Sequence, residues 1–358
     1  MLKTNYTLLL ISILIISIKW ITSYHFFQES IDVKIIFESI YDSKVYYPLI
    51  KYFSEFQFNY SYDPEINNLK IIPLPISGIL LHSFLLKTFS FYSFVIADII
   101  CVFLFLYIFY NIFKFAASSN LSIIFAILIF LLPTFITNSY LNDFSYLQNF
   151  ARNFYNLRVP RPMISNLYFF GFLLLILKLN INFKYNYKIF SLLGLIVGLT
   201  LSSFYYFFFT QAVILLSFLI IKFKSKVISE ILNNYKYYLL ASLVFIITII
   251  PFILNLILHE SEFTTRQCIY ELDYNKKLEL FNYLLNKYLS LKFIFLFLTI
   301  SILNIFINYF QYFEKKIINI FYISFLSSLF APIIFILLSN KSCVFYHFIN
   351  FIIVNGFL

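Results

Sequence analysis

Long apolar runs recur from one end of this chain to the other, and they constrain its fold more than any other feature. Most of them reach about 17 residues, close to the length that an α-helix needs to cross a bilayer. Charged residues make up 12% of the chain, whereas soluble domains carry about 25%. Only helices and closed barrels satisfy their backbone in lipid, and the short alternating segments of a barrel are absent. The sequence therefore predicts an all-α, polytopic integral membrane protein.

About ten transmembrane helices are expected, in a single transmembrane domain over residues 1–358. The stretch 71–89 is apolar but contains two prolines, His82 and Lys87, so we expect a juxtamembrane or re-entrant helix there. The last apolar run is short, and we expect a truncated or half-inserted final helix. The expected spans are residues 6–22, 91–114, 121–137, 163–179, 188–205, 206–222, 237–258, 291–310, 316–338 and 344–358.

The lysines predict which loops share a side of the membrane. If 71–89 does not span and the N-terminus is cytoplasmic, the lysine-rich turns all face the cytoplasm, as the positive-inside rule requires. The protein is then expected in a bacterial inner membrane. Membrane-flanking lysines also explain the net charge of +10, so no nucleic-acid partner is expected. The opposite, periplasmic or luminal loops hold nearly all carboxylates and all arginines; they are residues 23–90, 138–162, 259–290 and 339–343.

The first outer loop, 23–90, has the highest density of acids in the chain. Each acid is either the solvated face of a helix or a general base held over the membrane. Pro48 is expected to break or start a helix. Apolar residues spaced among the charges of 32–56 indicate one or two amphipathic helices on the membrane surface. These residues are Ile35, Ile36, Ile40, Tyr47, Leu49 and Phe53.

A second outer segment, 151–165, carries arginines in a chain that otherwise prefers lysine. Arg158 and Arg161 bracket one proline and precede another, and Arg152 lies just before them. Proline keeps the backbone extended, and guanidinium groups bind phosphates or carboxylates through paired hydrogen bonds. The segment is therefore either an anion clamp for a substrate or a contact with lipid headgroups.

Three further residues are candidates for substrate binding. Asp98 lies within an apolar run, where a carboxylate is costly and is by default a functional candidate. The alternative is that it reaches the interface or pairs with a neighbouring helix. His82 lies among apolar residues, where packing is the simpler role. Arg266 lies in the outer loop 259–290, which either binds an acceptor or is merely solvated.

The early part of the chain resembles the C-type glycosyltransferases, multi-pass enzymes that use polyprenyl-phosphate sugars. Residues 71–100, IIPLPISGILLHSFLLKTFSFYSFVIADII, have the proline pair, short apolar helix, turn and long span found around the second helix of that superfamily. Residues 42–51, DSKVYYPLIK, are similar to its acidic and aromatic stretch after the first span. The superfamily usually has two adjacent acids there, and Asp42 is followed by a serine. The resemblance is one of layout and covers about residues 8–140.

The resemblance implies transfer of a sugar from a polyprenyl-phosphate donor to a glycan, lipid or protein acceptor at the outer face. Asp42 would be the general base, with Asp32 and Glu29 as competitors, and the arginines would stabilise the leaving phosphate. No motif specifies a cofactor, although the carboxylates are compatible with a divalent cation. The first rival interpretation is a transporter or flippase for a lipid-linked or anionic substrate, which would use Asp98, His82 and the arginines as its path. Two other rivals are a polymerase or ligase of lipid-linked saccharide and a non-catalytic assembly subunit.

Overall fold

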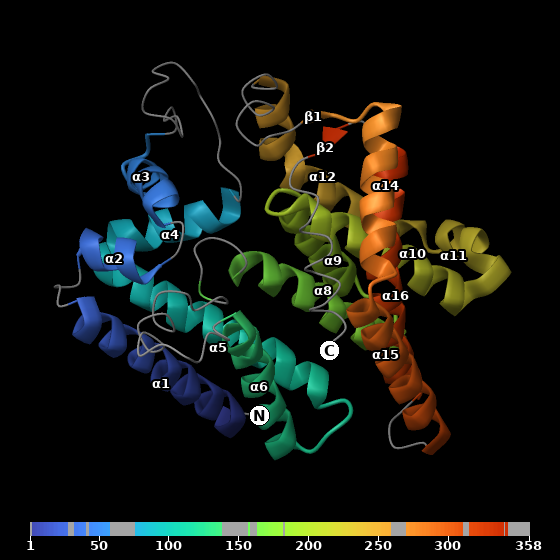
Figure 1. Ribbon diagram of the computed structural model, residues 1–358, viewed down its shortest axis with the longest axis horizontal. Helices are drawn as coiled ribbons and strands as arrows, with labels where there is room; N and C mark the ends of the chain where they lie inside the picture. The colour runs from blue at the N-terminus through green and yellow to red at the C-terminus, as the bar shows by residue number, and fades with distance from the viewer. Residues whose placement is uncertain are drawn as a thin grey trace. The chain divides into compact units, whose positions relative to one another are not determined.

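The structure is a computed structural model that describes most of the chain (Figure 1). Contacts divide it into two compact units, 1–171 with 202–204, and 172–201 with 205–358. The division falls within one helix, α8 (Met163–Ile181). The described residues are 2–27, 32–40, 43–57, 76–137, 157, 163–181, 183–258, 270–310, 315–339 and 341–342.

The first unit is helical throughout its described part. α1 packs against α5 and α2, and α4 packs against both α3 and α5. Figure 1 shows α1 running beside α5, with α2 near the C-terminal end of α1 and α3 beside α4. Its elements before α8 are α1 (Leu2–Phe27), α2 (Val33–Ser39), α3 (Ser43–Ser54), α4 (Ile76–Phe89), η1 (Ser90–Tyr92), α5 (Ser93–Phe113) and α6 (Ser119–Thr137).

The second unit is also helical, apart from one short antiparallel pair of strands. In that pair Tyr270 lies opposite Ser342, and Glu271 lies opposite Lys341. Helix α9 packs along α12, and α10 packs along α16. The elements are α9 (Tyr187–Leu201), α10 (Tyr205–Phe223), η3 (Lys224–Lys226), α11 (Val227–Asn233), α12 (Tyr235–Leu258), β1 (Tyr270–Glu271), α14 (Tyr274–Tyr288), α15 (Leu291–Phe310), α16 (Lys315–Leu338) and β2 (Lys341–Ser342).

Six helices among the described residues are long and apolar enough to cross a membrane, or seven if the bent pair formed by α14 and α15 counts as one span. The expected number of about ten is not confirmed. The expected final span, 344–358, lies outside the described residues. The six are Lys3–Phe27, Ile76–Phe113, Met163–Ile181, Tyr206–Asn233, Tyr235–Leu254 and Asn319–Leu338.

One expected span is shorter in the structure, and the helix expected not to span continues into the span that follows it. The span predicted over 188–205 is wrong, because α9 has only 15 residues and ends at Leu201, where Ser202 and Ser203 form a turn. α4, with 14 residues, is shorter than the roughly 20 that a crossing needs. It continues through η1 into α5, so that Ile76–Phe113 is one apolar helical segment of 38 residues.

The amphipathic pattern in residues 32–56 gives two helices, α2 and α3. All six apolar residues that the pattern singles out are buried, so the predicted amphipathic helices are confirmed. Pro48 is the exception, because it lies inside α3 and neither breaks nor starts it. The buried side chains are Ile35, Ile36, Ile40, Tyr47, Leu49 and Phe53.

Close backbone packing joins α9 to α12. Gly194 and Gly198 are spaced four apart, as in the GxxxG contacts of membrane helices. A Cβ atom added at Gly194 would lie 2.2 Å from the carbonyl oxygen of Ala241, and one at Gly198 would lie 2.8 Å from the Cβ of Thr248. Glycine at these positions therefore allows the two backbones to approach more closely than any side chain would permit.

Candidate functional site

The buried face of α1 carries polar side chains into the interior of the first unit. Ser12, Ile16, Lys19, Trp20 and Ser23 are all buried. Their spacing of three and four residues places them on one side of the helix. α1 packs this side against α5, whose own buried face includes an acid. This packing brings Lys19 of the apolar helix α1 to Asp98 of the apolar helix α5.

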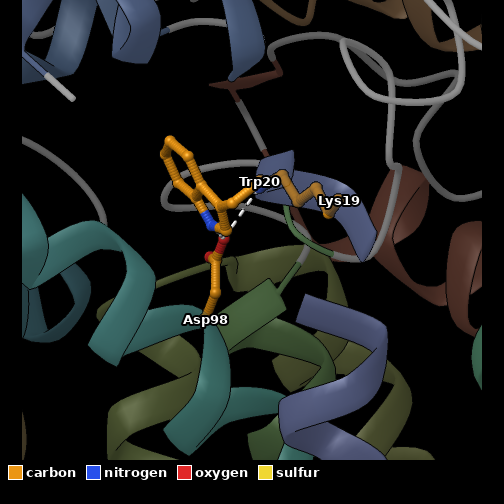
Figure 2. Close-up of polar contacts among 3 residues, drawn as sticks. All are labelled: Lys19, Trp20 and Asp98. Carbon is orange, nitrogen blue, oxygen red and sulfur yellow. Dashed lines mark hydrogen bonds and ion pairs between the residues drawn. The ribbon is translucent and has the colours of Figure 1, made fainter. Parts of the chain in front are cut away.

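Lys19 and Asp98 form a buried ion pair between α1 and α5 (Figure 2). The Lys19 Nζ lies 2.7 Å from Asp98 Oδ2, and the two side chains are 1% and 0% exposed. Trp20 Nε1 donates a second hydrogen bond to the same oxygen at 3.0 Å. The Lys19 ammonium also lies 4.9 Å from the centroid of the Trp20 ring. Asp98 Oδ1 has no hydrogen-bond partner among the described residues.

Such a pair holds two helices together in one rotational and axial register. Removal of either partner leaves an uncompensated buried charge, which costs about 3–5 kcal/mol in proteins where this has been measured. A charge-assisted bond at 2.7 Å, with a second donor on the same oxygen, is good geometry for compensating desolvation. The carboxylate oxygen that faces Lys19 and Trp20 is fully engaged, which leaves Oδ1 as the acceptor that could take another ligand.

Aromatic contacts extend this arrangement to α3 and α4. Phe94, one turn before Asp98 on α5, stacks with His82 of α4 at a centroid distance of 5.3 Å. Phe94 also stacks with Tyr47 of α3 at 6.1 Å. Burial raises the pKa of the Tyr47 phenol, which therefore stays neutral. We call Lys19, Trp20, Tyr47, His82, Phe94 and Asp98 the α1–α5 cluster.

His82 is the polar residue of this cluster with most unused bonding capacity. It is completely buried, and neither ring nitrogen has a hydrogen-bond partner among the described residues. Two of the predicted substrate-binding residues therefore belong to one buried cluster, since Asp98 binds Lys19 and His82 stacks on Phe94.

Asp32 has a structural task in this part of the fold. It is the N-cap of α2, and its Oδ1 accepts hydrogen bonds from the backbone N–H groups of Lys34 at 2.8 Å and Ile35 at 3.4 Å. Capping satisfies backbone donors that would otherwise have no partner at a helix start. Of the three predicted catalytic acids, Asp32 therefore uses its carboxylate to cap helix α2.

The other predicted site residues lie outside the described part of the chain. They comprise two catalytic candidates, Asp42 and Glu29, and four substrate-binding candidates, Arg152, Arg158, Arg161 and Arg266. Within the described ranges, no three His, Cys, Asp or Glu side chains come together as a metal site.

Sequence reasoning missed Lys19 and Trp20. A signal was available, since Lys19 is the charge inside the first apolar run and Asp98 is the charge inside another. Two opposite charges within apolar runs are expected to seek each other, because an unpaired one is costly in lipid. Trp20, the single tryptophan of the chain, carries an N–H donor that also needs a buried acceptor.

Fold and site together define a class: the chain is an all-α, polytopic membrane protein whose first unit contains a buried, paired charge. Comparison with protein-family models, with curated proteins and with solved structures finds no match to it.

Proposed function

We propose that this protein is a membrane glycosyltransferase that moves a sugar from a polyprenyl-phosphate donor to an acceptor. The observation that supports the proposal is the packing of α2 and α3, the described helices between α1 and α4, against the apolar helices of the first unit. α3 buries its apolar face, packs on α4, and reaches α5 through the contact of Tyr47 with Phe94. A loop held in this way suits a catalytic acid that must stay above the end of a donor lipid.

The layout of the first unit supports this function. A first span is followed by two amphipathic helices, a short apolar helix and a long span, in the order that resemblance to C-type glycosyltransferases implies. The Lys19–Asp98 pair fixes the end of α1 from which the loop leaves. Its role in the proposed enzyme is to position the loop.

Asp42 is the first choice for the general base. Asp32 caps α2 and Asp98 is bound by Lys19 and Trp20, so both have other tasks. Asp42 falls in the sequence between α2 and α3, and Glu29 is its remaining competitor. The base would take the proton of the acceptor hydroxyl as it attacks the anomeric carbon. Arg158 and Arg161 would stabilise the phosphate that leaves.

The proposal is tested with membranes that contain the full chain and a panel of polyprenyl-phosphate hexoses and pentoses labelled in the sugar. We expect at least one donor to lose its label to a product while polyprenyl phosphate is released. Asp42→Asn should lower this rate at least about 100-fold, because a general base contributes factors of that size. Glu55→Gln is the matched control, since it removes an exposed carboxylate from the same loop.

Full activity in Asp42→Asn would remove Asp42 from the role of base. If every labelled donor stays intact in the presence of the protein, the transferase proposal is wrong.

The second candidate is a transporter or flippase for a lipid-linked or anionic substrate. The observation that favours it is the charged pair of α1 and α5 with His82 beside it, because ionisable residues within membrane helices often line substrate or proton paths. In proteoliposomes the two functions give different products. A flippase moves the labelled lipid between leaflets and leaves the sugar attached, whereas a transferase separates sugar from lipid.

A further inference from the structure

A second polar cluster lies in the second unit, where the turn between α8 and α9 meets the connection from α10 to α12. Tyr185 donates a hydrogen bond of 2.5 Å to Oε1 of Glu230, and Asn234 Nδ2 donates to the same oxygen at 3.0 Å. Burial and the bond to Glu230 raise the pKa of Tyr185, so its phenol stays a neutral donor. Tyr185 and Asn234 thus both bind one carboxylate oxygen of Glu230.

Stacked aromatic rings fix the same two segments against each other. Tyr187 stacks with Tyr237 at 4.5 Å between centroids, and Tyr185 lies 5.0 Å from Tyr237. Phe190 of α9 packs edge-on against Tyr238 at 5.2 Å. These ring contacts pack the turn before α9 against the start of α12, and we call the five rings the aromatic platform.

Exposed lysines surround this platform, and we call them the lysine surface: Lys184, Lys188, Lys224, Lys226 and Lys236. Lys184 and Lys188 flank Tyr185 and Tyr187, and Lys236 precedes Tyr237. The segments 183–188 and 222–236 contain one acid, Glu230. Five lysines against one acid give this surface a net positive charge.

Apolar side chains are exposed beside these lysines. On α11, Ile228 is 74% and Leu232 is 66% exposed, and their spacing of four residues places them on one face. Tyr187 and Tyr235 are also exposed. The combination of exposed aliphatic residues, tyrosines and lysines is that of a helix lying in the membrane interface.

The length of the preceding helical segment agrees with this depth. α10 has 19 residues, and at about 1.5 Å per residue it is roughly 28 Å long. The hydrocarbon core is about 30 Å thick. If α10 crosses the core, η3 and α11, which follow its C-terminal end, lie at the level of the headgroups.

We propose that the lysine surface and α11 bind the headgroups of anionic phospholipids. Ile228 and Leu232 would enter the boundary between headgroups and acyl chains, and the ammonium groups would contact lipid phosphates. The inference does not depend on the proposed glycosyltransferase activity. Zwitterionic lipids would fill the same positions more weakly, because they offer no net charge to the lysines.

The test is a native mass spectrometry titration of the full-length protein in neutral detergent, with phosphatidylglycerol and phosphatidylcholine as the probes. The wild-type chain is expected to bind phosphatidylglycerol more tightly. The triple variant Lys224→Gln/Lys226→Gln/Lys236→Gln should lose that preference at least about tenfold, since each lysine near a lipid surface contributes a factor of about five. A triple Lys→Arg variant at the same positions should keep it.

The matched control is Lys51→Gln/Lys276→Gln/Lys287→Gln, which removes three exposed lysines from elsewhere in the chain. An equal loss of preference in this control would overturn the proposal, since the effect would then follow total charge. An unchanged preference in the first variant would overturn it as well. Equally effective displacement of the lipid by inorganic phosphate would assign the lysines to a soluble anion and likewise overturn it.

Discussion

Two helix pairs of this protein are joined by opposite means. α1 and α5 meet at a buried ion pair, Lys19 with Asp98, whereas α9 and α12 meet at two glycines that allow their backbones to touch. Lipid gives little hydrophobic drive for helix association, so a pair needs either polar bonds or very close packing. The first solution depends on charge and the second on the absence of side chains. Substitutions should therefore affect the two pairs in different ways.

The largest effect is expected at the glycine contact. Gly194→Leu adds a side chain where even a Cβ would lie 2.2 Å from the backbone oxygen of Ala241, so α9 and α12 must separate. We expect a loss of at least about 4 kcal/mol in the free energy of unfolding, at the upper end of single-substitution effects. Unfolding of the detergent-solubilised protein by SDS measures it.

Leu192→Ala, at an exposed position on the same helix, is the control and should change stability by about 0.5 kcal/mol or less. A Gly194→Leu protein as stable as the wild type would mean that the close approach of α9 and α12 does not exist.

The next effect is expected at the ion pair. Asp98→Leu leaves the buried Lys19 ammonium and the Trp20 N–H without their acceptor, and should cost about 3–5 kcal/mol. Since Trp20 is the chain's single tryptophan, its fluorescence spectrum should also change. Glu279→Leu, at an exposed acid of α14, is the control. An unaltered Trp20 spectrum in Asp98→Leu would show that the indole does not bind this carboxylate.

The smallest effect is expected at the N-cap of α2. Asp32→Ala removes the acceptor for the N–H groups of Lys34 and Ile35, and should cost about 1 kcal/mol. Asp32→Asn keeps an acceptor oxygen and should be nearly neutral. In the glycosyl-transfer assay the same Asn variant should retain activity. Loss of activity in a stable Asp32→Asn protein would return Asp32 to the role of base.

Local patterns in the sequence were sufficient for part of this architecture. The spacing of apolar residues in 32–56 identified the buried faces of α2 and α3, because amphipathic periodicity is a property of neighbouring residues. The end of α9 at Leu201 was not foreseen, since Ser202 and Ser203 interrupt an otherwise apolar stretch without glycine or proline.

The long-range pairing of Asp98 was harder to predict. Its partner lies 79 positions away in the sequence, and the match depends on how α1 and α5 are rotated about their axes. The sequence left open whether Asp98 binds substrate or pairs with a neighbouring helix. The structure brings it to Lys19 and Trp20, and adds His82 through Phe94. Asp42, Glu29 and the four arginines remain predictions from the sequence.

The most direct test of the central claim, that charge joins α1 to α5, is a double-mutant cycle on the pair. The free energy of unfolding is measured for Lys19→Met, for Asp98→Leu and for the two combined. Each single variant leaves one buried charge without its partner, whereas the double variant leaves neither. We predict that the double variant loses less stability than the sum of the single losses, by at least about 1 kcal/mol. Additive losses would contradict the claim.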